Sequence, residues 1–475
     1  MEFVKDFMQR RIALLASVAL IAASGASSAA KAQPFDDGCQ TASPNASICL
    51  GAQKVAEAGA AECRATPAPN SACINPVVGH SVDTDALAAY QSSWLHKAAQ
   101  LQYTLGDSVP LRDAQWLGTH NSFNTDSNGL TLSHTDNNQQ LTLTQQLDGD
   151  IRALELDVHQ VPGPNNGLGS DIVRVCHARG SDEMHAGCTT EPQLKDVVPE
   201  IRTWMNAHPT QVLMIYLEDN LEDDTGYEQV IDALNTTFGN LIYKPAAQDI
   251  KGGCADVPLD VSRDDIRATG ARVFFVGNCR AGWSADVFGW DANHVESGST
   301  PDYKPYPACD ATYNAGVYSD KLVRYFEDST WLSAVVDPAQ TPADHDADAL
   351  TPAKVTSMIS CGVNLFGFDQ FDPNDGRVAA SIWSWAPNEP NAIHGPCVME
   401  RADGRWATSE CQGVRPAACR VDDGSLSVSP AVDGRAAHAV CAARAGTFTA
   451  PRTGLEDAQL QALADHQAIW VNVEP

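Results

Sequence analysis

The chain has 475 residues, long enough for a sizeable core and for more than one domain, and its formal net charge is -29. With 60 acidic and 31 basic residues it offers no basic stripe for nucleic acid and is unsuited to nonspecific adhesion to anionic membranes. An anionic substrate would need a bound cation or a few local arginines to screen the repulsion.

The first 32 residues have the pattern of a secretory signal peptide. A basic region is followed by the apolar run 12–23 and by a small-x-small cleavage site at 30–32. The apolar run is too short to span a bilayer comfortably, which disfavours a membrane anchor. We expect residues 1–32, with four basic and two acidic side chains, to be removed, leaving a secreted or periplasmic protein of net charge about -31 without a transmembrane segment.

All 14 cysteines follow the expected cleavage site, an even number in a chain bound for an oxidising compartment. This favours disulfides, and the lack of a CxxC pair disfavours a zinc site. Cys176 and Cys188 bracket a segment that contains His177 and Arg179. The N-terminal segment 33–99, with four cysteines before about residue 79, receives no functional assignment.

Between about residues 100 and 378, several β-rich apolar runs end in polar residues. The expected strands are 116–120, 152–159, 172–177, 211–219, 271–278 and 364–369. Helices are expected between some of them, at 191–207 and 227–237. Strands that alternate with helices indicate a parallel sheet, and polar strand ends fit the C-terminal face of a closed α/β barrel. The pattern therefore predicts an irregular TIM-type (β/α) barrel over 100–378.

The polar strand ends carry a candidate site. Its members are His120, Asn121, Glu155, Asp157, His177 and Glu218. Glu155 and Asp157 lie two apart, so on a strand both side chains point to the same face, here the barrel interior. Asn121 and the three acids offer oxygen ligands that suit calcium, and the two histidines remain for proton transfer. Each residue alone could be a solvated strand end or a helix cap, but their shared position favours a site.

The motifs GTHNS, LELDV, VCH and IYLED, in this order, resemble the core of the phosphatidylinositol-specific phospholipase C family, in particular its calcium-dependent members. The resemblance covers four short segments across about a hundred residues. It implies that His120 is the general base and His177 the general acid. It also implies a Ca2+ ligand set of Asn121, Glu155, Asp157 and Glu218. The implied substrate is a phospholipid at a membrane surface or a soluble inositol phosphodiester, cleaved through a cyclic phosphate.

Two further residues could complete the site. Asp369 ends the last expected strand, which lies beside the first in a closed barrel, so its carboxylate could orient the imidazole of His120. A structural acid at a strand end is an equal alternative. Arg179 is a candidate phosphate contact, although an exposed loop arginine is at least as compatible with its position. The absence of a lysine cluster favours unphosphorylated phosphatidylinositol as the substrate.

The C-terminal residues 379–475 have a different character. The segment 383–420, with WAPNEPN, DGRW and three cysteines, resembles the second half of a C-type lectin-like domain, and 438–473 resembles its beginning. The resemblance implies a small, circularly permuted module with disulfides Cys397–Cys411 and Cys419–Cys441. The alternative is a disulfide-stapled cap on the barrel.

Sugar binding by this module is disfavoured. The EPN-like triplet 389–391 is present, but Trp406 is followed by Ala407 and Thr408 where such lectins have an asparagine and an aspartate as calcium ligands. Carbohydrate binding is therefore weakly supported, and a structural or protein-binding role is favoured.

Three functions compete at this stage. The first is a secreted calcium-dependent phosphoinositide phospholipase C. The second is a glycerophosphodiester phosphodiesterase, disfavoured by GTHNS in place of an HRG-type first motif. The third is an inactive barrel that binds carbohydrate or protein, disfavoured because both His120 and His177 are intact.

Overall fold

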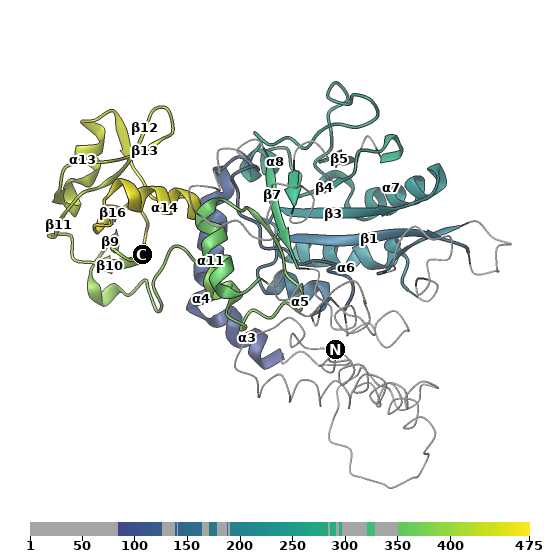
Figure 1. Cartoon of the computed structure of the whole chain (residues 1–475), viewed down its shortest axis with the longest axis horizontal. Coiled ribbons are helices and arrows are strands. Elements are labelled where there is room, and N and C mark those ends of the chain that lie inside the picture. The colour runs from purple at the N-terminus through teal and green to yellow at the C-terminus, as the bar shows by residue number, and fades with distance from the viewer. Residues whose placement is uncertain are drawn as a thin grey trace, which may run out of the picture.

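The computed structural model describes residues 84–125, 138–139, 141–163, 171–177, 188, 191–283, 286–290, 294–296, 321–327 and 350–475. The fold is mixed α/β, with a larger barrel and a smaller C-terminal module (Figure 1). The helices are α3 (Thr84–Ser92), α4 (Trp94–Leu105), α5 (Leu143–Asp148), α6 (Leu194–Ala207), α7 (Asp224–Phe238), α8 (Arg263–Ala268), α11 (Pro352–Cys361), α12 (Arg377–Ser381), α13 (Ala437–Ala442) and α14 (Gly454–Leu463). The barrel strands are β1 (Ala153–Val161), β2 (Ile172–Val175), β3 (Leu213–Asn220), β4 (Val273–Gly277), β5 (Val287–Gly289), β6 (His294–Glu296), β7 (Leu322–Phe326) and β8 (Leu365–Gly367).

Parallel strands form the predicted irregular TIM-type barrel. β1, β3, β4 and β5 pair in this order, and β6, β7 and β8 form a second parallel set. The segment 116–119 joins the two sets, because Gly118 bridges Ala153 of β1 and Thr119 bridges Phe368 just beyond β8. Within the described residues the ring is joined everywhere except between β5 and β6.

β2 lies outside this ring, so the expectation that 172–177 forms one of the parallel strands is wrong. β2 pairs antiparallel with the distal half of β1, with Val175 opposite Val158. Only residues 162–171 separate the two strands. Because a parallel crossover needs about a dozen residues or more, this short connection permits a hairpin only.

The period-2 alternation of the strands sorts side chains between the helices and the barrel interior. On β1, Leu154 and Leu156 pack in the cluster that includes the helices, whereas Ala153 belongs to the interior cluster. Glu155 and Asp157 continue the interior row toward the carboxyl end of the strand. The apolar base of the interior contains Trp116, Ala153, Met214, Phe274, Leu322 and Leu365. One end of the barrel interior is therefore lined by polar side chains, and the apolar cluster lies beneath them.

A glycine on β8 makes room for the first predicted catalytic residue. A Cβ at Gly367 would lie 2.8 Å from the Cβ of Phe326 and 3.5 Å from the Cβ of His120. The first of these distances is shorter than van der Waals contact allows, so a larger residue would push the neighbouring strand end away. The small residue lets β7, β8 and the His120 segment approach closely.

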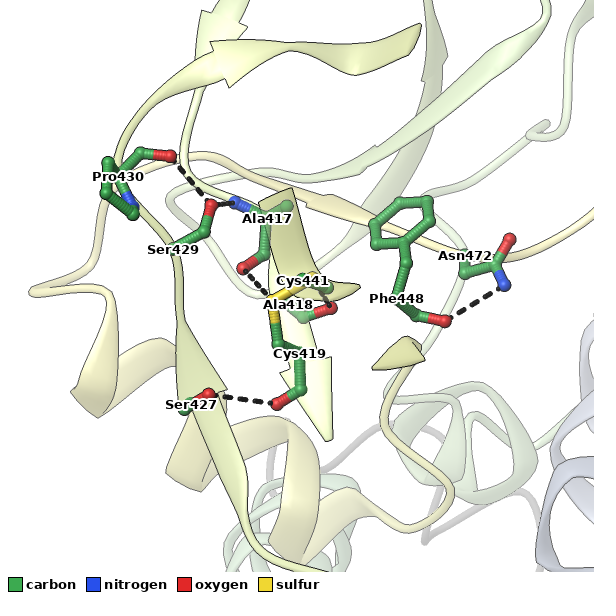
Figure 2. Close-up of a disulfide and its surroundings, with 9 residues drawn as sticks. All are labelled: Ala417, Ala418, Cys419, Ser427, Ser429, Pro430, Cys441, Phe448 and Asn472. Atoms are coloured by element: carbon green, nitrogen blue, oxygen red, sulfur yellow. Dashed lines mark hydrogen bonds between the residues drawn. A yellow bond between two sulfur atoms is a disulfide. The ribbon is translucent and has the colours of Figure 1, made fainter. Parts of the chain in front are cut away.

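The C-terminal module is built from short antiparallel strands. They are β9 (Cys397–Glu400), β10 (Trp406–Ser409), β11 (Val414–Arg415), β12 (Ala418–Val421), β13 (Leu426–Val428), β14 (Val432–Asp433), β15 (Gly446–Phe448) and β16 (Ile469–Val471). Its two disulfides, Cys397–Cys411 and Cys419–Cys441, are the pairs expected from the sequence. Figure 2 shows the second pair beside Ser429, whose hydroxyl accepts from the Ala417 N–H at 2.9 Å.

The barrel contains two more disulfides among the described residues, Cys176–Cys188 and Cys254–Cys279, and no described cysteine is free. No helix in the described part of the chain has the length and apolar character needed to cross a membrane.

A glutamine on α4 forms hydrogen bonds with the segment that joins the barrel to the C-terminal module. The Gln102 Oε1 accepts hydrogen bonds from the backbone N–H groups of Trp383 and Ser384 at 2.7 and 3.0 Å, and its Nε2 donates to the Ser381 carbonyl at 3.1 Å. Gln102 is buried. The helix that carries it also spans residues 99 and 100, between which the N-terminal segment and the barrel are expected to meet.

The EPN-like triplet is engaged within the module. The Glu389 Oε2 accepts from the Thr408 hydroxyl at 2.7 Å and from the Asn391 N–H at 2.8 Å, while its Oε1 lies 3.0 Å from His394 Nδ1. These contacts occupy both carboxylate oxygens of Glu389.

A buried carboxyl in the module predicts a pH-dependent stability. Glu400 on β9 is fully buried, and its Oε1 accepts from Gln461 Nε2 on α14. Burial raises the pKa of Glu400 to about 8, and that of the neighbouring Asp457 also rises. The unfolded chain ionises Glu400 near its ordinary value of 4.5, so the folded state loses relative stability as pH increases from there toward 8.

We expect the free energy of unfolding to decrease by a few kcal/mol over this range, since one pKa unit corresponds to about 1.4 kcal/mol. Glu400→Gln should flatten this dependence. Denaturant unfolding of both proteins between pH 5 and 8, followed by tryptophan fluorescence, measures the difference. An equally steep decline in the variant would assign the pH dependence to other groups.

Candidate active site

Three carboxylates converge at the polar end of the barrel. Glu155 and Asp157 come from β1 and Glu218 from β3, directly opposite Asp157 in the parallel register. One oxygen of each lies within 4.8 Å of those of the other two. Burial, followed by the charges of Glu218 and Glu155, raises the pKa of Asp157 well above its ordinary value, and Arg324 opposes this. Such crowding of acids is the usual arrangement of a cation site.

Asn121 lies at the edge of this carboxylate cluster. It adopts a left-handed backbone conformation with φ 44°, and its N–H donates to Glu155 Oε2 at 3.3 Å. With Nδ2 turned toward Asp157, the side chain donates to both carboxylate oxygens at 2.9 and 3.0 Å. Turned by 180°, the same amide would present Oδ1 to a cation shared with Asp157.

A buried arginine that the sequence analysis did not select also contacts the cluster. The Arg324 NH2 on β7 lies 2.5 Å from Glu155 Oε2. Its guanidinium is 4.4 Å from the ring centroid of Phe326 and 5.0 Å from that of Tyr216. Arg324 thus supplies one positive charge beside the three carboxyl groups.

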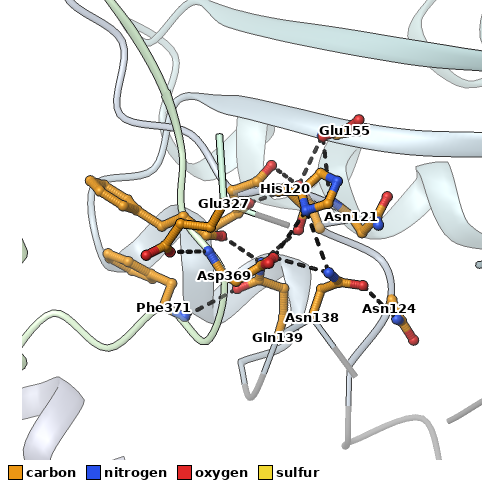
Figure 3. Close-up of polar contacts among 12 residues, drawn as sticks. His120, Asn121, Asn124, Asn138, Gln139, Glu155, Glu327, Asp369 and Phe371 are labelled. Atoms are coloured by element: carbon orange, nitrogen blue, oxygen red, sulfur yellow. Dashed lines mark hydrogen bonds and ion pairs between the residues drawn. The ribbon is translucent and has the colours of Figure 1, made fainter. Parts of the chain in front are cut away.

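His120 faces Asp369 across the junction between the first and last segments of the ring (Figure 3). The Nδ1 atom of His120 lies 3.1 Å from Asp369 Oδ1, and Asn138 Nδ2 donates to the same oxygen at 3.0 Å. Gln139 Nε2 donates to the backbone carbonyls of His120 and Phe368 at 2.6 and 2.7 Å. With Nδ1 bonded to a carboxylate, the imidazole ring is held in one orientation, as in a histidine that acts as a general base.

His177 follows β2 and is half-buried beside the Cys176–Cys188 disulfide. The Cys176 N–H donates to the Asp157 carbonyl at 3.3 Å, which ties this strand end to β1 at the level of the carboxylate cluster. Arg179, the predicted phosphate contact, lies outside the described residues.

The residues that sequence reasoning missed fall into two groups. Arg324 and Glu327 belong to the run LVRYFE, whose aromatic and β-branched residues could have indicated a strand. Asn138 and Gln139 come from a polar segment without periodicity, which offers no comparable signal.

The model of the Rv2075c PI-PLC-like domain family matches residues 75–375 of this chain. The chain belongs to the Rv2075c PI-PLC-like family. Membership in the Rv2075c PI-PLC-like family places it, at the level of the family, with phosphodiesterase-type enzymes.

Two relatives from Mycobacterium tuberculosis are similar over nearly the whole chain. The uncharacterized protein Rv2075c of strain ATCC 25618 / H37Rv is 49% identical over 435 residues, covering 90% of this chain and 88% of the relative. The uncharacterized protein MT2135 of strain CDC 1551 / Oshkosh matches to the same extent.

Among solved structures, this member of the Rv2075c PI-PLC-like family is similar to the phosphatidylinositol-specific phospholipase C from Listeria monocytogenes. The TM-score is 0.39 at 17% identity, covering 60% of this chain and 97% of the other. The calcium-dependent phosphoinositol-specific phospholipase C from Pseudomonas sp. gives a TM-score of 0.29 at 15% identity, covering 58% and 93%.

Proposed function

We propose that the protein is an exported, calcium-dependent phosphodiesterase that cleaves phosphatidylinositol to diacylglycerol and inositol phosphate through a cyclic phosphate. The observation that carries this proposal is the arrangement at one end of the barrel. There the carboxylates of Glu155, Asp157 and Glu218 converge near the His120–Asp369 pair.

The residues present fit a calcium ion in both chemistry and charge. Glu155, Asp157, Glu218 and Asn121 offer only oxygen ligands, which a hard divalent cation prefers. Three carboxylates and the guanidinium of Arg324 leave two negative charges, which a divalent cation would neutralise. When bound, calcium would lower the pKa of the attacking hydroxyl and offset the negative charge on the phosphoryl oxygens.

The two histidines divide the proton transfers. His120, oriented by Asp369, accepts the proton of the inositol 2-hydroxyl, whose oxygen then bonds to phosphorus. The bond from phosphorus to the diacylglycerol oxygen breaks, and His177 donates the proton that this leaving oxygen requires. Water can open the cyclic phosphate with the two roles reversed.

Other parts of the chain receive proposals of the same kind. We assign residues 1–32 to export, with which the described disulfides agree, and Arg179 to phosphate contact. Residues 379–475 are proposed to form the permuted lectin-like module, with a structural rather than sugar-binding role.

Purified mature protein, assayed on phosphatidylinositol vesicles and on glycerophosphoinositol with calcium or with a chelator, tests the function. We expect calcium-dependent release of diacylglycerol, with cyclic inositol phosphate appearing first. Release of glycerol 3-phosphate and inositol from glycerophosphoinositol without cleavage of the lipid would favour a glycerophosphodiester phosphodiesterase instead. Inactivity on both substrates would favour a binding function.

A further inference from the structure

The backbone around Asp369 is held from both sides by buried charged groups. The Asp369 N–H donates to Glu327 Oε2 at 2.6 Å. The Arg377 NH2 donates to the carbonyls of Asp369 and Gln370, both at 2.9 Å. Figure 3 shows both neighbours of Asp369: Glu327 lies at its backbone N–H and His120 at its carboxylate.

Glu327 and Arg377 also bind each other. Arg377 NH1 lies 2.6 Å from Glu327 Oε2, with 7% and 0% of their side chains exposed. Burial lowers the pKa of Arg377, but the charges of Asp375 and Glu327 outweigh this and raise it overall, so the guanidinium stays charged. Glu327 Oε1 accepts from the Leu350 N–H at 2.6 Å, which anchors the pair to the chain leading into α11.

The ion pair lies beside a bend of the chain that carries Asp369. β8 ends at Gly367, and Gln370 turns with φ 46°, so Asp369 lies on a bend beyond the regular ladder. A carboxylate on a bend keeps a fixed direction only if its own peptide groups are fixed. Glu327 binds the N–H of this residue and Arg377 its carbonyl, so the pair restrains both.

We propose that the Glu327–Arg377 ion pair is a positioning device for catalysis, which clamps the Asp369 peptide so that its carboxylate stays on His120 Nδ1. This inference rests on the proposed function, because it assigns the clamp to the proposed general base. Burying an ion pair is an inefficient way to stabilise a fold, since desolvation offsets much of the attraction. The pair binds both the N–H and the carbonyl of Asp369, and these two contacts support a role in orientation.

A double-mutant cycle tests the coupling through Asp369. We expect Glu327→Gln to lower kcat roughly ten- to a hundredfold with little change in KM, because a small displacement of the base suffices for such losses. In an Asp369→Asn background the same change should cost less than about twofold. An equal loss in both backgrounds would overturn the proposal. If Glu327→Gln does not fold, Arg377→Lys can replace it in the double-mutant cycle, because lysine keeps the positive charge but lacks the forked guanidinium.

A spectroscopic measurement tests the clamp independently of any activity. The Nδ1–H proton of His120, bonded to a carboxylate, should give a downfield resonance in 15N-histidine-labelled protein. We expect it to move upfield in Asp369→Asn, Glu327→Gln and Arg377→Lys. An unchanged resonance in Glu327→Gln and Arg377→Lys would overturn the clamp, whereas a shifted resonance in a protein inactive on phosphatidylinositol would overturn only the proposed function.

Asp107→Asn is the matched control for loss of a buried ion pair. Asp107 Oδ1 lies 2.9 Å from Nε of the buried Arg263, and the same guanidinium donates to the Tyr103 carbonyl on α4. This ion pair therefore lies at α4 and not at Asp369. We expect this variant to lose stability but to keep the His120 resonance and the kcat of the folded protein. Losses of kcat and resonance equal to those of Glu327→Gln would mean that the clamp is merely structural.

Discussion

His120→Ala should lower kcat on phosphatidylinositol by roughly a hundred- to ten-thousandfold, the usual contribution of a general base. The expected loss is large because the imidazole is buried and already bonded to Asp369 through Nδ1, so the proposed base is oriented before the substrate binds. The fold should persist, since Asn138 still donates to the Asp369 carboxylate. Steady-state kinetics and circular dichroism on the same preparation check both expectations.

The chain contains a second histidine–aspartate pair that serves as a control. His96 Nδ1 on α4 lies 2.8 Å from Asp150 Oδ2, and Tyr90 donates to the same oxygen at 2.6 Å. His96→Ala should therefore lower stability but leave the kcat of the folded enzyme intact. If it reduced kcat as much as His120→Ala does, the loss at His120 would reflect general destabilisation.

His177→Ala should be impaired for a different reason. A substrate whose leaving group needs no proton should restore part of the activity of this variant, because only the acid becomes dispensable. His120→Ala should remain impaired on that substrate. Equal rescue of both variants, or of neither, would mean that the roles are assigned wrongly.

The second large effect is expected at the carboxylate cluster. Asp157→Asn or Glu218→Gln should weaken calcium binding and reduce activity by roughly a hundredfold or more, because a Lewis-acid contribution of several kcal/mol is at stake. Calcium titration by isothermal calorimetry measures the binding, and initial rates across the same calcium range measure the activity. A chelator should abolish the activity of the wild-type protein.

The residue after Glu218 provides the control for the loss of a negative charge. Asp219 alternates to the other face of β3, where its carboxylate accepts from the Tyr227 hydroxyl at 3.0 Å and pairs with Arg280 at 2.7 Å. Asp219→Asn removes one negative charge from the same strand without removing a proposed ligand. Full activity of the wild-type protein after exhaustive chelation would refute the calcium proposal.

Alternation on a strand is a local rule, and it explains which part of the candidate site could be predicted from the sequence. Glu155 and Asp157 two residues apart had to share a face, and the long apolar runs around them had to be buried. The barrel and its polar end follow from the same pattern. The pairing Cys419–Cys441 was implied by resemblance and is confirmed.

What the sequence did not reveal depends on distant parts of the chain meeting. β5 and β6 have three residues each, so their runs offer little periodicity, and the pairing of Arg324 with Glu155 spans 169 positions. The antiparallel direction of β2 depends on the length of its connection rather than on its composition. Glu327 and Arg377 lie 50 positions apart, and no local pattern predicts that both reach the peptide of Asp369.

The glutamine on α4 limits how this protein can be divided or recombined. A protein ending near residue 378 would cut into α12, just after Arg377, and would strip Gln102 of its partners at Ser381, Trp383 and Ser384. An unsatisfied buried polar group costs about 1 to 3 kcal/mol, and the apolar contacts of the lost segment would add to this. The barrel and the C-terminal module are therefore difficult to exchange as separate units. A gene fusion or domain swap should place its junction within the module, after Ser384, and not at the apparent border between the two folds.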